Sequence, residues 1–73
     1  MILTKDQAYE AAKTLCEYAS GKSWSTTSAF ERQEYQGIVY ALAEKIDIPN
    51  SPEAYMVFLA WIGQSPHIAN ANL

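Results

Sequence analysis

Near the C-terminus lies a run of eight residues without a charged or amide side chain, YMVFLAWI from Tyr55 to Ile62. Its flanks carry helix signals: Ser51 can cap the N-terminus, Pro52 suits the first helical position, and Gly63 can end the last turn. A helix that is apolar all round must be covered all round. A chain of 73 residues has little other structure for that purpose. The sequence therefore predicts that this helix is the central element of the fold, or that part of it binds a partner.

A helical wheel divides this run into two stripes. The first, which neighbouring helices can bury, comprises Ala54, Val57, Phe58, Trp61 and Ile62. The second lies mainly elsewhere and comprises Tyr55, Met56, Leu59 and Ala60. Two small helices cannot bury both stripes unless loops or the C-terminal tail help, and an uncovered stripe would exceed the apolar patch that soluble monomers usually expose. The predicted interface residues are Tyr55, Met56 and Leu59, with Tyr40 and Trp24 in support.

A first helix is predicted over about residues 5–20. It opens with a capping box, in which the Thr4 hydroxyl accepts from the backbone N–H of Gln7 and the Gln7 side chain reaches back. Gly21, which can adopt the left-handed conformation, ends it. Its apolar face comprises Ala8, Ala11, Ala12, Leu15, Cys16 and Ala19. A face so rich in alanine lets another helix approach closely but buries little area per residue.

A second helix is predicted over about residues 29–46, opened by a capping box of Ser28 and Glu31. It ends before Pro49, which biases the residue preceding it away from helical geometry. Its predicted apolar half comprises Phe30, Tyr35, Ile38, Ala41, Leu42 and Ile46, with Val39 at its edge. Gly37 lies in the middle of this helix, where glycine costs about 1 kcal/mol relative to alanine. We expect it to mark a close contact with another backbone.

These patterns predict an all-α, small three-helix domain, with helices at about 5–20, 29–46 and 52–62. Residues 1–63 form the single helical domain, and residues 64–73 form a loosely ordered C-terminal tail. The polar connector between the first two helices holds one large residue, Trp24. Its indole either plugs the end of the core or serves as an exposed anchor for a partner.

The chain has one cysteine, so an internal disulfide is impossible. The N-terminus lacks the basic and apolar regions of a signal peptide. The apolar run is far shorter than the roughly 20 residues that cross a bilayer. These features predict a cytoplasmic protein that does not enter the membrane.

The sequence offers little chemistry. Cys16 lies on the small-residue face of the first helix, and the only histidine, His67, lies in the predicted tail. A nucleophilic cysteine needs a nearby base, and nothing in the sequence places these two side chains together. One cysteine and one histidine are also too few for a structural zinc site. We therefore expect no enzymatic activity, no cofactor and no metal.

The favoured function is a non-catalytic protein–protein interaction module, a small inhibitor or regulator that occupies a partner surface or associates with itself as a homodimer. The alternative is a nucleic-acid-linked regulator, either a helix-turn-helix-like binder or an acidic DNA mimic. The net charge of −3 and the absence of Lys or Arg after Lys45 make direct nucleic-acid binding unlikely to be the main role. In size, acidity and lack of catalytic residues the chain is similar in general character to small phage and mobile-element inhibitors, anti-CRISPR proteins among them.

Overall fold

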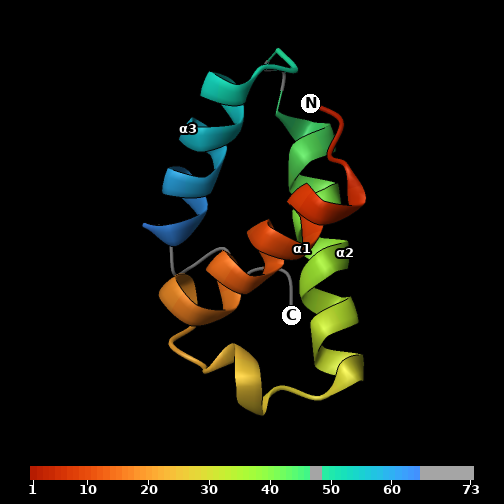
Figure 1. Ribbon diagram of the computed structural model, residues 1–73, viewed down its shortest axis with the longest axis vertical. Helices are drawn as coiled ribbons and strands as arrows, with labels where there is room; N and C mark the ends of the chain where they lie inside the picture. The colour runs from red at the N-terminus through yellow and green to blue at the C-terminus, as the bar shows by residue number, and fades with distance from the viewer. Residues whose placement is uncertain (47–48, 65–73) are drawn as a thin grey trace.

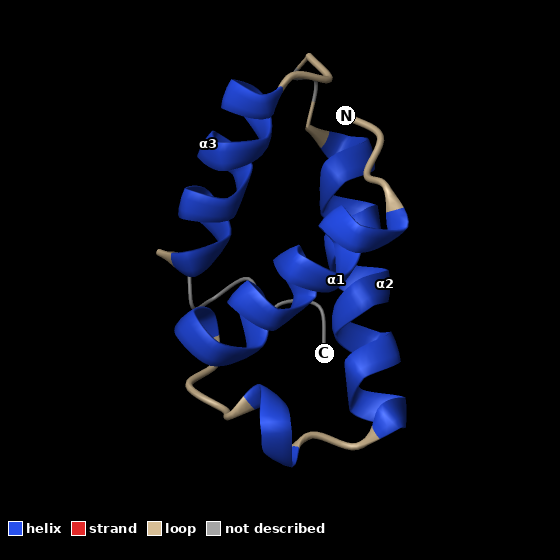
Figure 2. Cartoon of the chain, in the orientation of Figure 1, coloured by secondary structure: helices blue, strands red, loops and turns tan. Residues whose placement is uncertain are grey.

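Three α-helices make up most of the computed structural model, which describes residues 1–46 and 49–64 (Figures 1 and 2). In chain order the elements are α1 (Lys5–Thr14), the π-helical turn η1 (Leu15–Ala19), the 3₁₀ turn η2 (Trp24–Thr26), α2 (Ala29–Lys45) and α3 (Pro52–Gly63). These described residues contain no strand. The predicted all-α three-helix fold is confirmed. Of the predicted tail, everything beyond Gln64 lies outside the described residues.

Each of the three helices begins at the residue that local sequence chemistry predicts. The Thr4 hydroxyl accepts from the Gln7 backbone N–H at 3.1 Å, and the Gln7 side chain accepts from the Thr4 N–H at 3.0 Å. Ser28 and Glu31 form the same reciprocal pair. Ser51 caps α3 by accepting from the N–H three residues on, at 3.1 Å. Each such cap stabilises its helix by about 1 kcal/mol relative to alanine.

The first helix changes its winding before it ends. At Leu15 the hydrogen-bond pattern widens, and the N–H of Ser20 donates to the Leu15 carbonyl, five residues back, at 3.1 Å. Gly21 then adopts a φ of 77°, the left-handed conformation that the sequence predicted for it. The helical span of the predicted 5–20 segment is confirmed, whereas the π-helical turn has no sequence signal that we recognise.

The centre of the described fold is formed by α1 and η1. Both contact α2 on one side and α3 on the other (Figure 1). Their predicted apolar face is fully or almost fully buried and comprises Ala8, Ala11, Ala12, Leu15, Cys16 and Ala19. Small alanine side chains let two helices pack against one thin central helix. The apolar helix α3 is therefore a flanking element, and not the central one.

On α2 the buried stripe differs from the predicted one. Tyr35 and Ile38 are buried as expected, but Val39 and Ala43 complete the stripe. The predictions for Phe30 and Ala41 are wrong, because the Phe30 side chain is 70% exposed and Ala41 is also exposed. Both sides of α2 carry apolar residues, so a helical wheel alone could not predict which side is buried. The buried side is the one that faces α1.

The expected close contact at Gly37 is also wrong, because a methyl group there would meet no atom within 4 Å. The glycine that does lie against a neighbour is Gly63. A methyl group on it would lie 3.6 Å from Thr14 Cγ2 and 3.7 Å from Tyr18 Cβ. The small residue that brings two helices together is thus at the end of α3, where it meets the junction of α1 and η1.

Candidate interaction surface

One narrow stripe of α3 faces the rest of the protein. Tyr55, Phe58 and Ile62 are buried against α1 and η1, at the i, i+3, i+7 spacing of a single helix face. The Tyr55 hydroxyl donates to the carbonyl oxygen of Gln7 at 3.1 Å and also to the carboxylate of Glu10. Burial, followed by the hydrogen bond and the negative charge of Glu10, raises the pKa of Tyr55 above its usual range. This hydroxyl fixes the rotation of α3 about its axis.

The opposite side of α3 is open to solvent and apolar. Met56 is 61% exposed, Val57 66% and Trp61 41%, and Ala60 is also exposed. We call these four residues the outer face of α3. No charged side chain interrupts it between Glu53 and Gln64, which mark its two ends. The Trp61 ring leans on Phe58, with ring centroids 6.3 Å apart.

The predicted division of the apolar run is wrong for three residues. Val57 and Trp61 were assigned to the buried stripe and are exposed, whereas Tyr55 was assigned to the uncovered stripe and is 8% exposed. The cause is that α3 packs mainly against one neighbour, the central helix formed by α1 and η1, so the buried stripe is narrower and rotated toward Tyr55. A run without polar residues carries no signal for that rotation.

Two depressions flank Met56 on the side where α3 meets α1. The first, of about 520 Å³, lies by the N-terminal ends of both helices and includes Thr4, Ser51 and Tyr55 in its lining. The second, of about 380 Å³, lies toward the C-terminal end of α3 and is lined by Thr14, Tyr18, Met56, Leu59, Ala60, Gly63 and Gln64. Met56 lines both depressions. It therefore stands as a ridge between two hollows along the α1–α3 seam.

The structure brings three of the five predicted interface residues together. Tyr55 and Met56 line the first depression, and Met56 and Leu59 line the second. Of the three, Met56 is exposed, Leu59 is half-buried and Tyr55 offers little surface. Tyr40 is exposed, but it lies on α2, across α1 from α3 (Figure 1).

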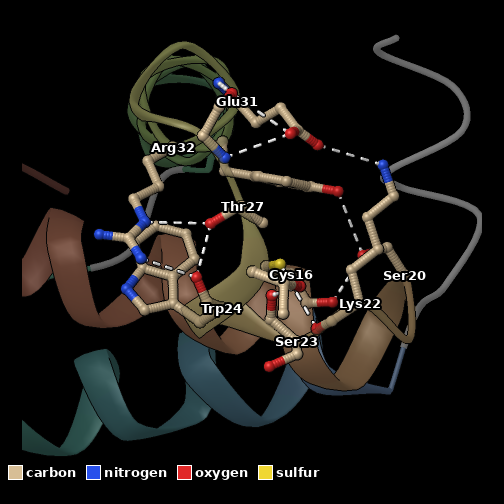
Figure 3. Close-up of polar contacts among 11 residues, drawn as sticks. Cys16, Ser20, Lys22, Ser23, Trp24, Thr27, Glu31 and Arg32 are labelled. Carbon is tan, nitrogen blue, oxygen red and sulfur yellow. Dashed lines mark hydrogen bonds and ion pairs between the residues drawn. The ribbon is translucent and has the colours of Figure 1, made fainter.

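Trp24 is the fifth predicted residue, and its side chain is only 5% exposed. Its indole Nε1 donates to the Tyr9 hydroxyl at 2.9 Å, and the Arg32 guanidinium carbon lies 5.1 Å from the centre of the indole ring. Arg32 also donates to the Trp24 carbonyl at 2.9 Å and to the Thr27 hydroxyl at 3.0 Å (Figure 3). The interpretation of Trp24 as a plug at the end of the core is confirmed, and its indole is not part of the accessible surface.

Cys16 lies in the π-helical turn η1, close to the loop that leads from η1 to Trp24 (Figure 3). Its side chain is buried, and the Sγ atom donates to the Lys22 carbonyl oxygen at 3.5 Å. Burial raises the pKa of the thiol, so the reactive thiolate is disfavoured. His67, the only imidazole of the chain, lies outside the described residues. Cys16 therefore packs as a small apolar residue.

Nearby, Lys22 and Glu31 form an ion pair at 3.4 Å on the surface. The pKa of Glu31 is lowered, first by the backbone N–H of Ser28 and then by the Lys22 side chain. The pair connects the loop after η1 to the first turn of α2 (Figure 3). Exposed ion pairs of this kind contribute little to stability.

Within residues 1–46 and 49–64, no group of three or more His, Cys, Asp or Glu side chains is placed to hold a metal ion. None of the three described helices combines the length and the apolar character that a bilayer crossing requires. Comparison with protein-family models, with curated proteins and with solved structures found no match to this chain.

Proposed function

We propose that this chain is a non-catalytic protein–protein interaction module, a small inhibitor or regulator that occupies a partner surface or associates with itself. The single observation that carries the proposal is the outer face of α3. Four apolar residues lie together there in solvent, with no charge between Glu53 and Gln64. Apolar clusters of this kind on small proteins mark contact sites.

The composition of the outer face fits the role. Methionine and tryptophan are enriched in protein interfaces, and charged residues are depleted from interface centres. A partner side chain can insert into either of the two depressions beside Met56. Because Tyr55, Phe58 and Ile62, with Leu59 and Gly63 beside them, pack α3 against the central helix, most of the outer face is left open to solvent.

The remaining polar residues favour a structural interpretation over a catalytic one. Arg32 and Tyr9 hold Trp24, Glu10 holds Tyr55, and Cys16 is buried with a raised thiol pKa. We therefore propose a protein without enzymatic activity, acting in the cytoplasm. The nucleic-acid-linked alternative has less support, because two of the five basic side chains, Arg32 and Lys22, have internal partners.

The test is affinity capture from the organism that encodes the chain, with three matched baits. These are the unchanged chain, Val57→Glu on the outer face and Phe30→Glu on α2, a control that adds the same charge at a position of similar exposure. A specific partner should be retained by the unchanged chain and by Phe30→Glu, and recovered at least about tenfold less with Val57→Glu, because a buried unpaired carboxylate costs more than 1.4 kcal/mol. Equal recovery with all three folded baits would contradict the proposal.

A further inference from the structure

We propose that the outer face of α3 binds a second copy of this chain, with the two α3 helices packed antiparallel about a twofold axis. This inference rests on the proposed function and names the partner. The axis passes between the two helices, midway along the exposed face, at the level of the Phe58–Leu59 peptide. Isologous pairs of this kind are the commonest homo-oligomers.

The pattern of exposed residues is symmetric about that axis. Counted outward from the midpoint, the exposed positions from Glu53 to the C-cap Gln64 form matched pairs: Val57 with Ala60, Met56 with Trp61, and Glu53 with Gln64; the exposed Pro52 lies outside this range. In an antiparallel pair of helices, Val57 of each copy therefore contacts Ala60 of the other copy near the centre of the interface. The small Ala60 side chain permits the close interaxial distance of about 8 Å.

Charge selects the antiparallel direction over the parallel one. Glu53 is the only charged side chain on the exposed side of α3, and it lies in the first turn. In a parallel pair the two Glu53 carboxylates would face each other across the contact. In the antiparallel pair each carboxylate lies opposite the amide of Gln64, which can donate a hydrogen bond to it. The antiparallel pair also opposes the two helix dipoles.

The two depressions along the α1–α3 seam fit the same arrangement. In an antiparallel pair, Met56 of the second copy falls on the same flank as Met56 of the first, displaced by about 7.5 Å along the axis at 1.5 Å per residue. That displacement places it over the 380 Å³ depression between Ala60, Gly63 and Tyr18. The flexible thioether of each Met56 can therefore fill the hollow beside the other. The two Trp61 rings lie together on the opposite flank.

One short helix and its flanks cover less than the roughly 800 Å² per partner of a standard interface. We therefore expect a reversible dimer in exchange with the monomer. Sedimentation velocity on the full chain, from about 10 µM to about 1 mM, should show the mass moving from one chain toward two. Val57→Glu should weaken association at least about tenfold, because its two carboxylates would meet near the axis. Phe30→Glu should leave association unchanged.

Disulfide trapping tests the direction. The variants Glu53→Cys and Gln64→Cys should cross-link to each other when mixed under mild oxidation, and neither should cross-link alone. In the antiparallel pair, two copies of position 53 lie about 16 Å apart along the axis, beyond the roughly 7 Å between Cα atoms that a disulfide spans. The native Cys16 is fully buried, so it does not compete.

Four results would overturn the inference. Cross-linking of each variant with itself would mean a parallel pair, and a dimer insensitive to Val57→Glu would mean a different face. A chain that stays monomeric, while Val57→Glu still loses a captured partner, would replace the second copy with another protein and leave the proposed function standing. A monomer that captures nothing would overturn both proposals.

Discussion

The hydroxyl of Tyr55 on α3 donates a hydrogen bond to the carboxylate of Glu10 on α1. A second hydrogen bond runs from the same hydroxyl to the Gln7 carbonyl oxygen, at 3.1 Å. These bonds join two helices that are far apart in sequence, and Tyr55 shares its face of α3 with the buried residues Phe58 and Ile62. They determine which side of α3 is presented to solvent.

Replacement of Tyr55 by phenylalanine should therefore destabilise the protein. The ring packing is kept, but Glu10 loses a charge-assisted hydrogen bond, and such bonds contribute about 1.5–3 kcal/mol. Urea denaturation followed by circular dichroism measures the free energy of unfolding. Tyr40→Phe is the matched control, because the Tyr40 side chain is exposed and should change stability by less than about 0.5 kcal/mol. A change below about 0.5 kcal/mol for Tyr55→Phe as well would contradict the role of the hydroxyl.

The same tyrosine should make stability depend on alkaline pH. The pKa of Tyr55 is raised in the folded state, so above the ordinary tyrosine pKa of about 10 the unfolded chain loses this proton while the folded chain retains it. The stabilisation from this group is complete below that pH and declines as the pH rises. The difference in unfolding free energy between the unchanged chain and Tyr55→Phe should shrink between about pH 9 and pH 11. A difference that stays constant over that interval would show that Tyr55 titrates normally.

Arg32→Lys should destabilise the protein although it preserves the charge. Lysine cannot donate at once to the Trp24 carbonyl and the Thr27 hydroxyl in the geometry of the guanidinium. It also changes the cation–π contact, in which the guanidinium carbon lies 5.1 Å from the centre of the indole ring. The expected loss is about 1–2 kcal/mol, measured by urea denaturation. Lys22→Arg, at an exposed ion pair, is the matched control and should leave the free energy of unfolding unchanged. If Arg32→Lys is as stable as this control, the Arg32 contacts with Trp24 and Thr27 do not stabilise the fold.

Two glycine-to-alanine changes should act in opposite directions. Gly21 has a φ of 77°, so Gly21→Ala should destabilise the protein by about 1 kcal/mol. Gly37 lies in the middle of α2 with nothing within 4 Å of an added methyl group. Gly37→Ala should therefore stabilise the protein by about 0.5–1 kcal/mol. Thermal unfolding of both variants in one buffer compares them directly, and shifts in the same direction would refute the assignment.

Local chemistry made the helix boundaries predictable from the sequence. The caps at Thr4, Ser28 and Ser51 depend on side chains within three residues of the atoms they satisfy. The left-handed Gly21 was predictable for the same reason. Nothing comparable specifies the rotation of α3, because all of its sides are apolar. That rotation depends on Glu10, which is 45 residues away from its partner Tyr55 along the chain.

The candidate interaction surface was likewise predictable only in part. The sequence predicted an uncovered stripe that includes Met56 and Leu59. Met56 is exposed and Leu59 is half-buried, and both line the second depression at the α1–α3 seam. Val57 and Trp61 on the outer face were missed, because a wheel without polar residues has no marked side. Trp24 was ambiguous because its fate depends on Tyr9 and Arg32, which lie on two other helices.

The position of α1 between α2 and α3 has a consequence for motion. Since α3 packs mainly on one side of the central helix and α2 on the other, α3 can open without disturbing the contact of α1 with α2. Amide hydrogens of α3 should therefore exchange with solvent faster than those of α1 and α2 when exchange is followed by mass spectrometry. Anything that covers the outer face should slow exchange in α3 first. The rate of amide exchange in α3 would then show whether its outer face is occupied.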